Sequence, residues 1–415
     1  MKFFINSYFG DNQSIGLLSH IKKRLPYGMD DQWMVFSHYT ERGWTVDNLW
    51  HIFTDFYGGQ YAPLAFLSYL VLYAGFGYDP FYFHMFSLLL HIGCVCLVWK
   101  LISSLLRVHG GVSEKQILYV NFITTLLFAV HPINVEAVAW ISALKVLLYA
   151  FFYLLGLLCY LRYIRTSKIF YYVLTIGCFL CSFWGKEQAI TFPLALLIVD
   201  WFTNRNMKNL EVWSEKMSFL IMAFFFGIIT VLSQGKGPYE MIFPLYQRLL
   251  FGCFALVEYI TKSLLPVNLN FFYPFPIVLG EEPPLHYYLY PVVLLFLMGW
   301  IIAYRNNRYL VFGVLLFLVN LLFSIHLFNM SRHAIVADRY MYLSYVGIAF
   351  LIANGIWWLR KRLSYFKAAL VFLFFYCFFL SVYTFHYTKK RENTTMVKKY
   401  TKEVLEKRLN GSNHL

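Results

Sequence analysis

Charged and polar residues stand at the borders of long apolar runs, and these residues are the candidates for chemistry. The first group is Asp30-Asp31, an adjacent carboxylate pair in a polar and aromatic stretch before the first long apolar run. One carboxylate of such a pair can act as general base on an acceptor hydroxyl, while the other orients the substrate or shifts its neighbour's pKa. The pair also fits a helix N-cap or a solvated loop, so its spacing alone does not distinguish a catalytic role from a structural one.

A second group lies between two apolar runs, where His131 and Glu136 frame the sequence His-Pro-Ile-Asn-Val-Glu. Polar side chains at the edge of a membrane span are costly unless they line a cavity, which makes both residues candidate site residues. The structural alternative is that His131 caps the preceding helix and that Glu136 lies in the first turn of the next one, where the helix dipole favours an acid.

Basic residues at other borders could hold a phosphate group. Lys186 lies between two apolar runs, where it can pair with the adjacent Glu187 or hold a lipid phosphate as a point charge. Arg339 begins an apolar run, where it can snorkel to the interface or grip phosphate through two parallel hydrogen bonds. Further candidates in these border segments are Lys145, Arg332 and His333.

Helices that cross a membrane must position these groups. The chain has 415 residues, of which 60% are hydrophobic and 13% charged, whereas a soluble domain has about 25% charged residues. An all-α, multi-pass membrane bundle is therefore expected, and soluble enzyme folds, disulfide scaffolds and membrane β-barrels are excluded. The run 249–265 is interrupted by Glu258 and Lys262 and predicts a re-entrant or interfacial helix. We expect about ten spans, at 82–106, 117–130, 140–161, 169–185, 188–202, 217–233, 289–304, 309–325, 341–358 and 368–386.

Lysine and arginine gather in five alternate loops, which the positive-inside rule assigns to the cytoplasm. The third of these loops holds Arg205, Lys208 and Lys216. Residues 26–63, 131–136 and 326–340 should then share the extracytoplasmic side. We expect three regions: an extracytoplasmic segment with a juxtamembrane helix (1–80), the transmembrane bundle (81–388) and a basic amphipathic tail (389–415).

Two features resist that topology. No apolar run precedes residues 1–80 to carry them across the membrane, so we expect that a first span is missing from this chain. The tail is basic, which favours the cytoplasm, whereas the alternation of spans places it outside.

Several other functions are disfavoured. The net charge of +14 is spread between the spans and accompanies no nucleic-acid-binding motif, so no nucleic-acid partner is expected. All seven cysteines lie in apolar runs, and the Cys178–Cys181 spacing has no second pair nearby, which favours packing over a metal site. Dinucleotide, Walker, zinc-protease and nucleophile-elbow motifs are missing from the sequence, and no cofactor is implied.

The order of these groups resembles the membrane domain of the transmembrane and tetratricopeptide-repeat-containing O-mannosyltransferases and their bacterial relatives, which are class C (GT-C) glycosyltransferases. The resemblance covers about residues 27–360. Its matching positions are Asp30-Asp31, Tyr61-Ala62-Pro63-Leu64, His84, His91, His131-Pro132, Glu136 to Trp140, Lys186-Glu187, Asp200-Trp201, Tyr273-Pro274, Arg339-Tyr340 and Tyr342. The sequence departs from the family at Ala62, where relatives usually have arginine, and at Lys145-Val146, which lacks the usual acid. No tetratricopeptide repeats follow residue 390.

The resemblance implies a GT-C-like enzyme of the inner or plasma membrane. Its donor would be a polyprenyl-phosphate-linked sugar, its acceptor an extracytoplasmic protein or glycan, and its catalytic acid Asp30 or Asp31, with inversion at the anomeric carbon. Arg339, Lys186 and Lys145 are the expected ligands of the donor phosphate. Two alternatives stay open: a transporter or flippase of lipid-linked glycans, which would carry charges such as Lys100, Glu258 and Lys262 within spans, and an inactive scaffold.

Overall fold

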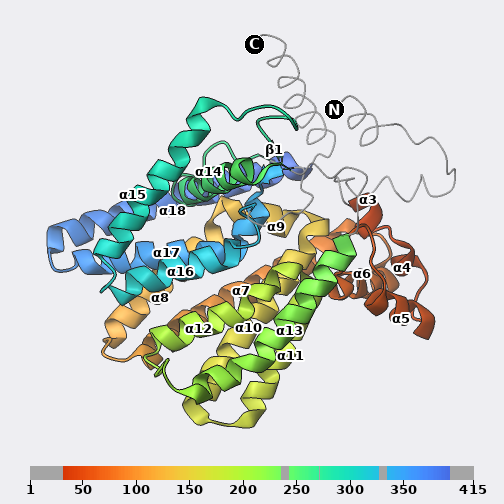
Figure 1. The fold of residues 1–415 in the computed structure, drawn as a ribbon, viewed down its shortest axis with the longest axis horizontal. Helices are drawn as coiled ribbons and strands as arrows, with labels where there is room; N and C mark the ends of the chain where they lie inside the picture. The colour runs from red at the N-terminus through yellow and green to blue at the C-terminus, as the bar shows by residue number, and fades with distance from the viewer. Residues whose placement is uncertain (1–30, 235–242, 271, 327–333, 393–415) are drawn as a thin grey trace.

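The computed structural model describes residues 31–234, 243–270, 272–326 and 334–392. It is 79% helical, and its described part contains one two-stranded sheet (Figure 1). The all-α membrane bundle expected from the sequence is confirmed at this level.

A helix forms along each of the ten apolar runs that the sequence marked. Their bounds are Pro80–His109 (α7), Glu114–Val130 (α8), Leu144–Thr166 (α10), Ile169–Gly185 (α11), Phe192–Phe202 (α12), Leu210–Gln234 (α13), Leu289–Ala303 (α15), Arg308–Leu321 (α16), Met341–Leu359 (α17) and Leu363–Glu392 (α18). Helix α14 (Leu245–Leu264) follows the interrupted run.

The number of spans is smaller than expected. Among the described residues, six helical units are long and apolar enough to cross a membrane: those containing α7, α10, α13, α15, α17 and α18. A seventh appears if α8 is joined to the short helices that follow it across a bend of 50°. Helices α11, α12 and α16 have 17, 11 and 14 residues, short of the roughly 20 that a span needs. The predicted count of about ten is therefore not confirmed.

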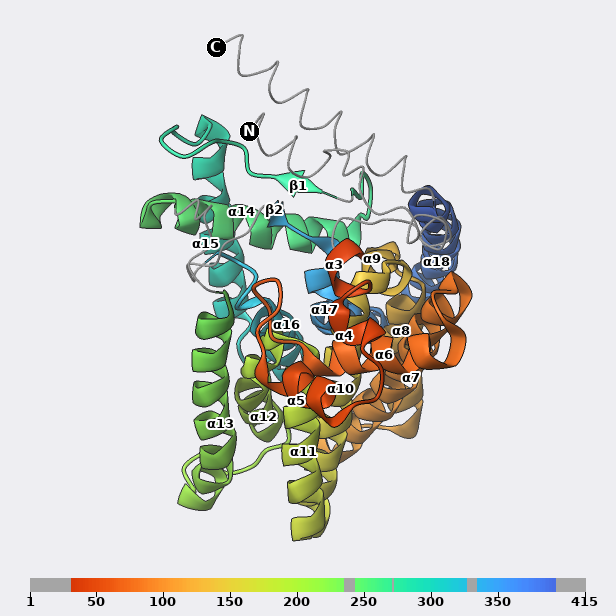
Figure 2. The same cartoon turned by 90° about the vertical axis from the view of Figure 1, so that its right-hand side faces the viewer.

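Helix α14 is not one of the six candidate spans. Figure 2 shows it lying crosswise over one end of the bundle. Its Gly252 is essential for this packing, since a Cβ there would clash with the carbonyl oxygen of Ile325 in the turn after α16.

Short helices and 3-10 turns gather at one end of the bundle, which we call the site pole. They include η1 (Pro132–Asn134), α9 (Val135–Ala139), η2 (Ile141–Ala143), η3 (Glu187–Thr191) and η5 (Asp338–Tyr340). Gly185 ends α11 at this pole, and a Cβ there would lie 2.7 Å from the backbone nitrogen of Tyr149. Glycine therefore lets the end of α11 touch the backbone of α10, which brings Lys186 beside the start of α10.

The N-terminal helices form a small unit on the site pole. They are α3 (Asp31–Met34), α4 (His38–Glu41), α5 (Val46–Thr54) and α6 (Pro63–Phe76), with their own apolar core around Tyr39, Ile52 and Phe66. In Figure 1 this unit projects beside the bundle. Gly58 and Gly59 have positive φ, which makes the tight turn between α5 and α6 that presents Gln60 to the bundle.

Two loops and the end of α18 complete the site pole. Strand β1 (Tyr273–Pro274) pairs antiparallel with β2 (Ala334–Val336), which leads directly into η5. The hydroxyl of Thr384 in α18 donates to the carbonyl of Val130 at 2.8 Å, so α18 ends at this pole. Of the three segments predicted to share one side, the described parts of 131–136 and 326–340 contact each other here, and α3 of the first segment contacts η2. The tail beyond Glu392 lies outside the described residues.

The main apolar core fills the space between α7, α8, α10, α12, α16 and α17, and much of it is aromatic. Helix α15 has no buried residue and packs against α14 and η4 (Leu285–Tyr288). The rigid part of the fold thus lies beneath the site pole.

Candidate functional site

Three basic side chains from separate helix breaks converge at the site pole. Lys145 is in the first turn of α10, Lys186 lies between α11 and η3, and Arg339 lies in η5. Lys186 experiences the charges of both Lys145 and Arg339. We call these three residues the cation cluster; they are the three that the sequence predicted as phosphate ligands.

Lys186 is the most deeply buried member, with 3% of its surface exposed. Its ammonium lies 4.6 Å from the ring centre of Tyr340. Within the described residues it has neither a hydrogen-bond acceptor nor an ion pair within 4.0 Å, so the expected alternative of a local pair with Glu187 is wrong. Burial lowers the pKa of Lys186 to about 8, although the charge of Glu187 opposes the shift.

Lys145 is also buried, and its ammonium donates to Oε1 of Gln60 at 2.5 Å. The sulfur of Met34 is 3.7 Å from the same nitrogen. Met34 ends α3, which begins at Asp31, so the segment after the predicted carboxylate pair lies beside the cation cluster. Asp30 and the side chain of Asp31 lie outside the described residues, and their catalytic role stays a prediction.

Arg339 is held by Glu136 from α9. The backbone N–H of Arg339 donates to Oε2 of Glu136 at 2.7 Å, and Nη1 donates to Oε1 at 2.7 Å. The rings of Trp140 and Tyr340 lie 5.2 Å and 5.1 Å from the guanidinium carbon. The two rings and the carboxylate fix the direction of the guanidinium. A snorkelling arginine would instead extend toward water without such partners.

Asp338 anchors η5 on its other side. Its buried carboxylate accepts hydrogen bonds from the hydroxyls of Tyr273 at 3.0 Å and Tyr387 at 3.4 Å. Lys262 of α14 lies over the Tyr273 ring, 4.1 Å from its centre. Burial and the charge of Asp338 raise the pKa of Tyr273, so this hydroxyl stays a donor at neutral pH. Tyr273, one of the matching positions of the predicted resemblance, thus anchors η5 through Asp338.

His131 caps the elements on both sides of it. As the structural alternative predicted, it is the C-cap of α8, where its backbone N–H donates to the carbonyl of Leu127 at 3.1 Å. Its Nδ1 accepts a hydrogen bond from the backbone N–H of Ile133 at 3.2 Å and so caps η1, the turn after it. Its ring lies against Tyr345, with the ring centres 4.1 Å apart. Glu136 does lie in the first turn of α9, as the structural alternative predicted. Arg332 and His333 lie outside the described residues.

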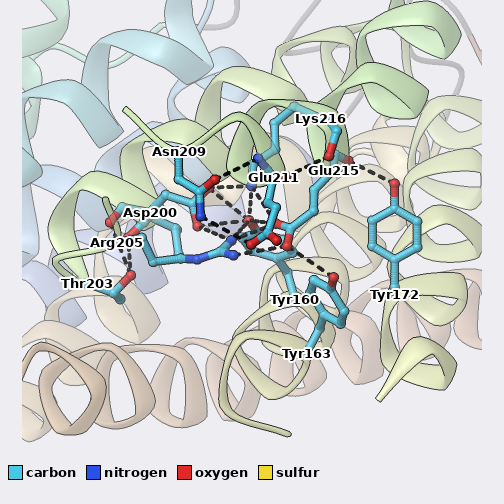
Figure 3. Close-up of polar contacts among 12 residues, drawn as sticks. Tyr160, Tyr163, Tyr172, Asp200, Thr203, Arg205, Asn209, Glu211, Glu215 and Lys216 are labelled. Atoms are coloured by element: carbon cyan, nitrogen blue, oxygen red, sulfur yellow. Dashed lines mark hydrogen bonds and ion pairs between the residues drawn. The ribbon is translucent and has the colours of Figure 1, made fainter. Parts of the chain in front are cut away.

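A second polar cluster lies where α13 begins (Figure 3). Arg205 donates to Asp200 at 3.2 Å and to Glu215 at 2.6 Å and 2.9 Å, while Lys216 contacts Asp200 and lies 3.1 Å from Glu215. The hydroxyl of Tyr160 also donates to Asp200 at 2.8 Å. We call the four charged residues the ion-pair cluster. Two acids balance two bases, so it joins α10, α12 and α13 without an unpaired charge.

The charges that would suit a transporter do not line the middle of a span. Lys100 is exposed on α7. Lys262 lies 3.8 Å from Glu258 on α14, which is not a candidate span. The described residues contain no group of three or more His, Cys, Asp or Glu side chains able to hold a metal ion. A site that works without metal stays a prediction.

Sequence reasoning missed Gln60, Trp140, Tyr340 and Asp338 as partners of the cation cluster, although Trp140 and Tyr340 stand in the motifs it used. It also counted Arg205 and Lys216 as loop charges only. Asp200, a lone acid at the end of an apolar run with a base five residues later, was the available signal for the ion-pair cluster.

Comparison with curated proteins identifies similar chains. The protein O-mannosyl-transferase TMTC2 of Mus musculus is 32% identical over 189 residues, which is 41% of this chain and 21% of that protein. The protein O-mannosyl-transferase TMTC4 of Homo sapiens is 32% identical over 167 residues, covering 35% of this chain and 22% of the relative. Tmtc3 of Drosophila melanogaster, which has the same enzyme name, is 28% identical over 172 residues, or 37% and 18% of the two chains.

The predicted resemblance is confirmed. Together with the candidate spans, the similarity supports a multi-pass membrane protein. The matched region spans about a fifth of the length of these relatives. No family model and no solved structure matches the chain.

Proposed function

We propose that this protein transfers a sugar from a polyprenyl-phosphate donor to a protein acceptor at the extracytoplasmic face of the membrane. The observation that carries the proposal is the buried ammonium of Lys186, which lies near Lys145 and Arg339 and has no hydrogen-bond acceptor among the described residues. A buried cation is costly unless an anion compensates it, and a phosphate supplies both charge and acceptor oxygens. The names of the relatives supply the reaction class.

The three cations would contact the phosphate in different ways. Arg339, oriented by Glu136, would supply a planar pair of N–H donors, while Lys145 and Lys186 would act as point charges. Negative charge grows on the phosphate as its bond to the sugar breaks. Cations fixed in a dry site stabilise that charge more than mobile cations in water do.

The acceptor hydroxyl would attack the anomeric carbon on the face opposite the phosphate. The new carbon–oxygen bond forms as the bond to the phosphate oxygen breaks, and the polyprenyl phosphate leaves, so the anomeric configuration inverts. We propose Asp30 or Asp31 as the base that takes the hydroxyl proton. The place of α3, which begins at Asp31 and whose Met34 contacts Lys145, supports this assignment.

The same proposal includes a GT-C-like bundle in the inner or plasma membrane with the site pole outside. The short apolar helices α11, α12 and α16 would complete the set of about ten crossings, each joined to a longer neighbour.

Two measurements on the purified full chain in lipid nanodiscs test the proposal. A polyprenyl-phosphate analogue should bind the wild type about tenfold to a hundredfold more tightly than Arg339→Lys or Lys186→Gln, because each loses a charged hydrogen bond. Radiolabelled mannose should move from polyprenyl-phosphate mannose to a threonine-containing peptide. Equal affinity in the wild type and both variants would contradict the phosphate site, and binding without transfer would favour the scaffold or the flippase.

A further inference from the structure

Helix α5 carries an apolar stripe that leads from solvent to the cation cluster. Val46, Trp50 and Phe53 follow the spacing i, i+4, i+7, which places them on one side of the helix. The Phe53 ring packs edge to face against Trp184, with the ring centres 5.1 Å apart, and Trp184 precedes Lys186 by two residues. Val46 and Trp50 are 86% and 68% exposed. The stripe is therefore open at one end and joined to the candidate site at the other.

The segment that carries the stripe is acidic. Residues 33–62 contain the acids Glu41, Asp47 and Asp55 and one base, Arg42, which gives a net charge of −2 in a chain whose net charge is +14. Asp47 follows Val46 directly, and its side chain is 76% exposed. The open stripe thus combines apolar contact area with negative charge.

We infer that this face of α5 is the docking surface for the acceptor polypeptide, and that it selects segments combining apolar or aromatic residues with lysine or arginine. The inference rests on the proposed function for the identity of its occupant. Charge separates this occupant from a lipid surface: helices that lie in membrane interfaces carry lysine and arginine on their polar face, whereas α5 carries Asp47 beside its open stripe. An anionic membrane would be repelled where a basic peptide is attracted.

Geometry sets the distance between the docking contact and the modified residue. A helix is about 10 Å across, so a peptide on the open stripe must pass about that distance to reach the segment holding Lys186. An extended chain advances about 3.3–3.6 Å per residue. The acceptor hydroxyl should therefore lie about three residues from the basic and apolar residues that dock on α5.

Binding of two labelled peptides to the full chain in nanodiscs, without donor, tests the inference. The probes are a nonapeptide of three Thr-Val-Lys repeats and its Thr-Val-Glu counterpart. The lysine peptide should bind at least tenfold more tightly to the wild type, and Trp50→Ala should remove about tenfold of its affinity. Asp47→Lys should shift the preference toward the glutamate peptide. Trp358→Ala is the matched control, because Trp358 is similarly exposed at 66% but lies in the last turn of α17, and it should leave binding unchanged.

Transfer assays separate this inference from the proposed function. If mannose transfer occurs with the same KM for the peptide in wild type and Trp50→Ala, the docking surface is wrong and the transferase stands. If the lysine peptide binds as expected but accepts no sugar, the transferase is wrong and the docking surface stands. Quenching of Trp50 fluorescence by brominated lipids, taken as the difference between wild type and Trp50→Phe, would show that lipid covers the stripe and would overturn the inference.

Discussion

Glu136 fixes Arg339 at two points, its backbone N–H and its Nη1, each at 2.7 Å. The residues are 203 positions apart and come from α9 and η5, two short elements at the site pole. One carboxylate therefore sets the position of the η5 backbone and the direction of the guanidinium. Any ligand that uses Arg339 depends on Glu136 without touching it.

Replacing Glu136 with glutamine should weaken binding of a polyprenyl-phosphate analogue about tenfold to a hundredfold, because the guanidinium loses its oriented partner. Simple electrostatics predicts the opposite, since removing a negative charge near three cations favours an anion. The sign of the change thus reports whether orientation or net charge dominates. Isothermal calorimetry on the wild type and Glu136→Gln measures it.

Glu187→Gln is the matched control. Glu187 raises the pKa of Lys186 through its charge but makes no hydrogen bond to Arg339. Its removal should leave binding of the analogue unchanged or slightly tighter. A loss of affinity as large as that expected for Glu136→Gln would show that analogue binding depends on the acidic charge at this pole and not on the orientation of Arg339.

Binding of the analogue should weaken as pH rises from 7 to 9, because Lys186, with a pKa of about 8, loses its charge. Lys186→Arg should bind with little dependence on pH in that range. A wild-type profile that is flat from pH 7 to 9 would remove Lys186 from the phosphate site.

Stability without ligand should change in the opposite direction. The ordinary lysine pKa of 10.5 applies to the unfolded chain, so between pH 8 and 10.5 the unfolded state binds more protons than the folded state. Stability should therefore rise across this window, by on the order of 3 kcal/mol at most. Thermal unfolding of the wild type compared with Lys186→Met isolates this contribution, since the variant lacks the titrating group.

Asparagine at Asp30 or Asp31 should reduce sugar transfer by about 10²-fold to 10⁴-fold if that residue is the general base. Asparagine keeps the size of the side chain and removes the proton acceptor, so binding of the donor analogue should stay close to that of the wild type. Single-turnover transfer and analogue binding are measured on the same preparations. Full activity in both single variants and in the double variant would show that the pair is structural.

The ion-pair cluster should matter for stability and not for donor binding. Lys216→Met leaves the buried Asp200 with one cation fewer, and breaking a buried pair costs about 3–5 kcal/mol. The double variant Asp200→Asn with Lys216→Met restores neutrality and should recover part of the loss. Helix α13 continues for 18 residues, about 27 Å, from Lys216 to Gln234 before its contact with η3, so the affinity for the donor analogue should not change.

Labelling with a membrane-impermeant thiol reagent tests the sidedness. Val46→Cys, an exposed position on α5, should react in intact cells, whereas Lys208→Cys, exposed between α12 and α13, should react only after permeabilisation. Ser37 is unsuitable for this purpose because it is fully buried. Labelling of both positions in intact cells would contradict the proposed orientation.

The helices themselves could be predicted because solid apolar runs leave the chain few other conformations in a membrane. The number of crossings could not be predicted from the sequence. The apolar run that contains α16 is long enough for a span, but the helix that forms in it has only 14 residues, and hydropathy does not show where a helix ends. The interrupted run 249–265 was predicted to be re-entrant or interfacial from Glu258 and Lys262, and the corresponding helix α14, with 20 residues, is not among the candidate spans of the described residues.

The cation cluster could be predicted as three separate border residues but not as a site. Which borders meet depends on close backbone contacts such as that of Gly185 with Tyr149, and no local pattern encodes them. The partners of the cations could not be predicted from the sequence either, because they come from distant parts of the chain. Arg339 is bound by Glu136, and Lys145 is bound by Gln60. Sequence reasoning predicted the residue types, and tertiary packing decided their pairing.

Helix α18 is 30 residues long, about 45 Å, while the hydrocarbon layer is about 30 Å thick. Such a helix must tilt or stand out of the bilayer, and a thicker or thinner bilayer changes the balance between the two. Near its end, Tyr387 donates a hydrogen bond to Asp338, the residue before Arg339. Hydrophobic mismatch acting on α18 is thereby linked to Arg339, the arginine proposed to bind phosphate, which makes bilayer thickness a variable of the proposed site.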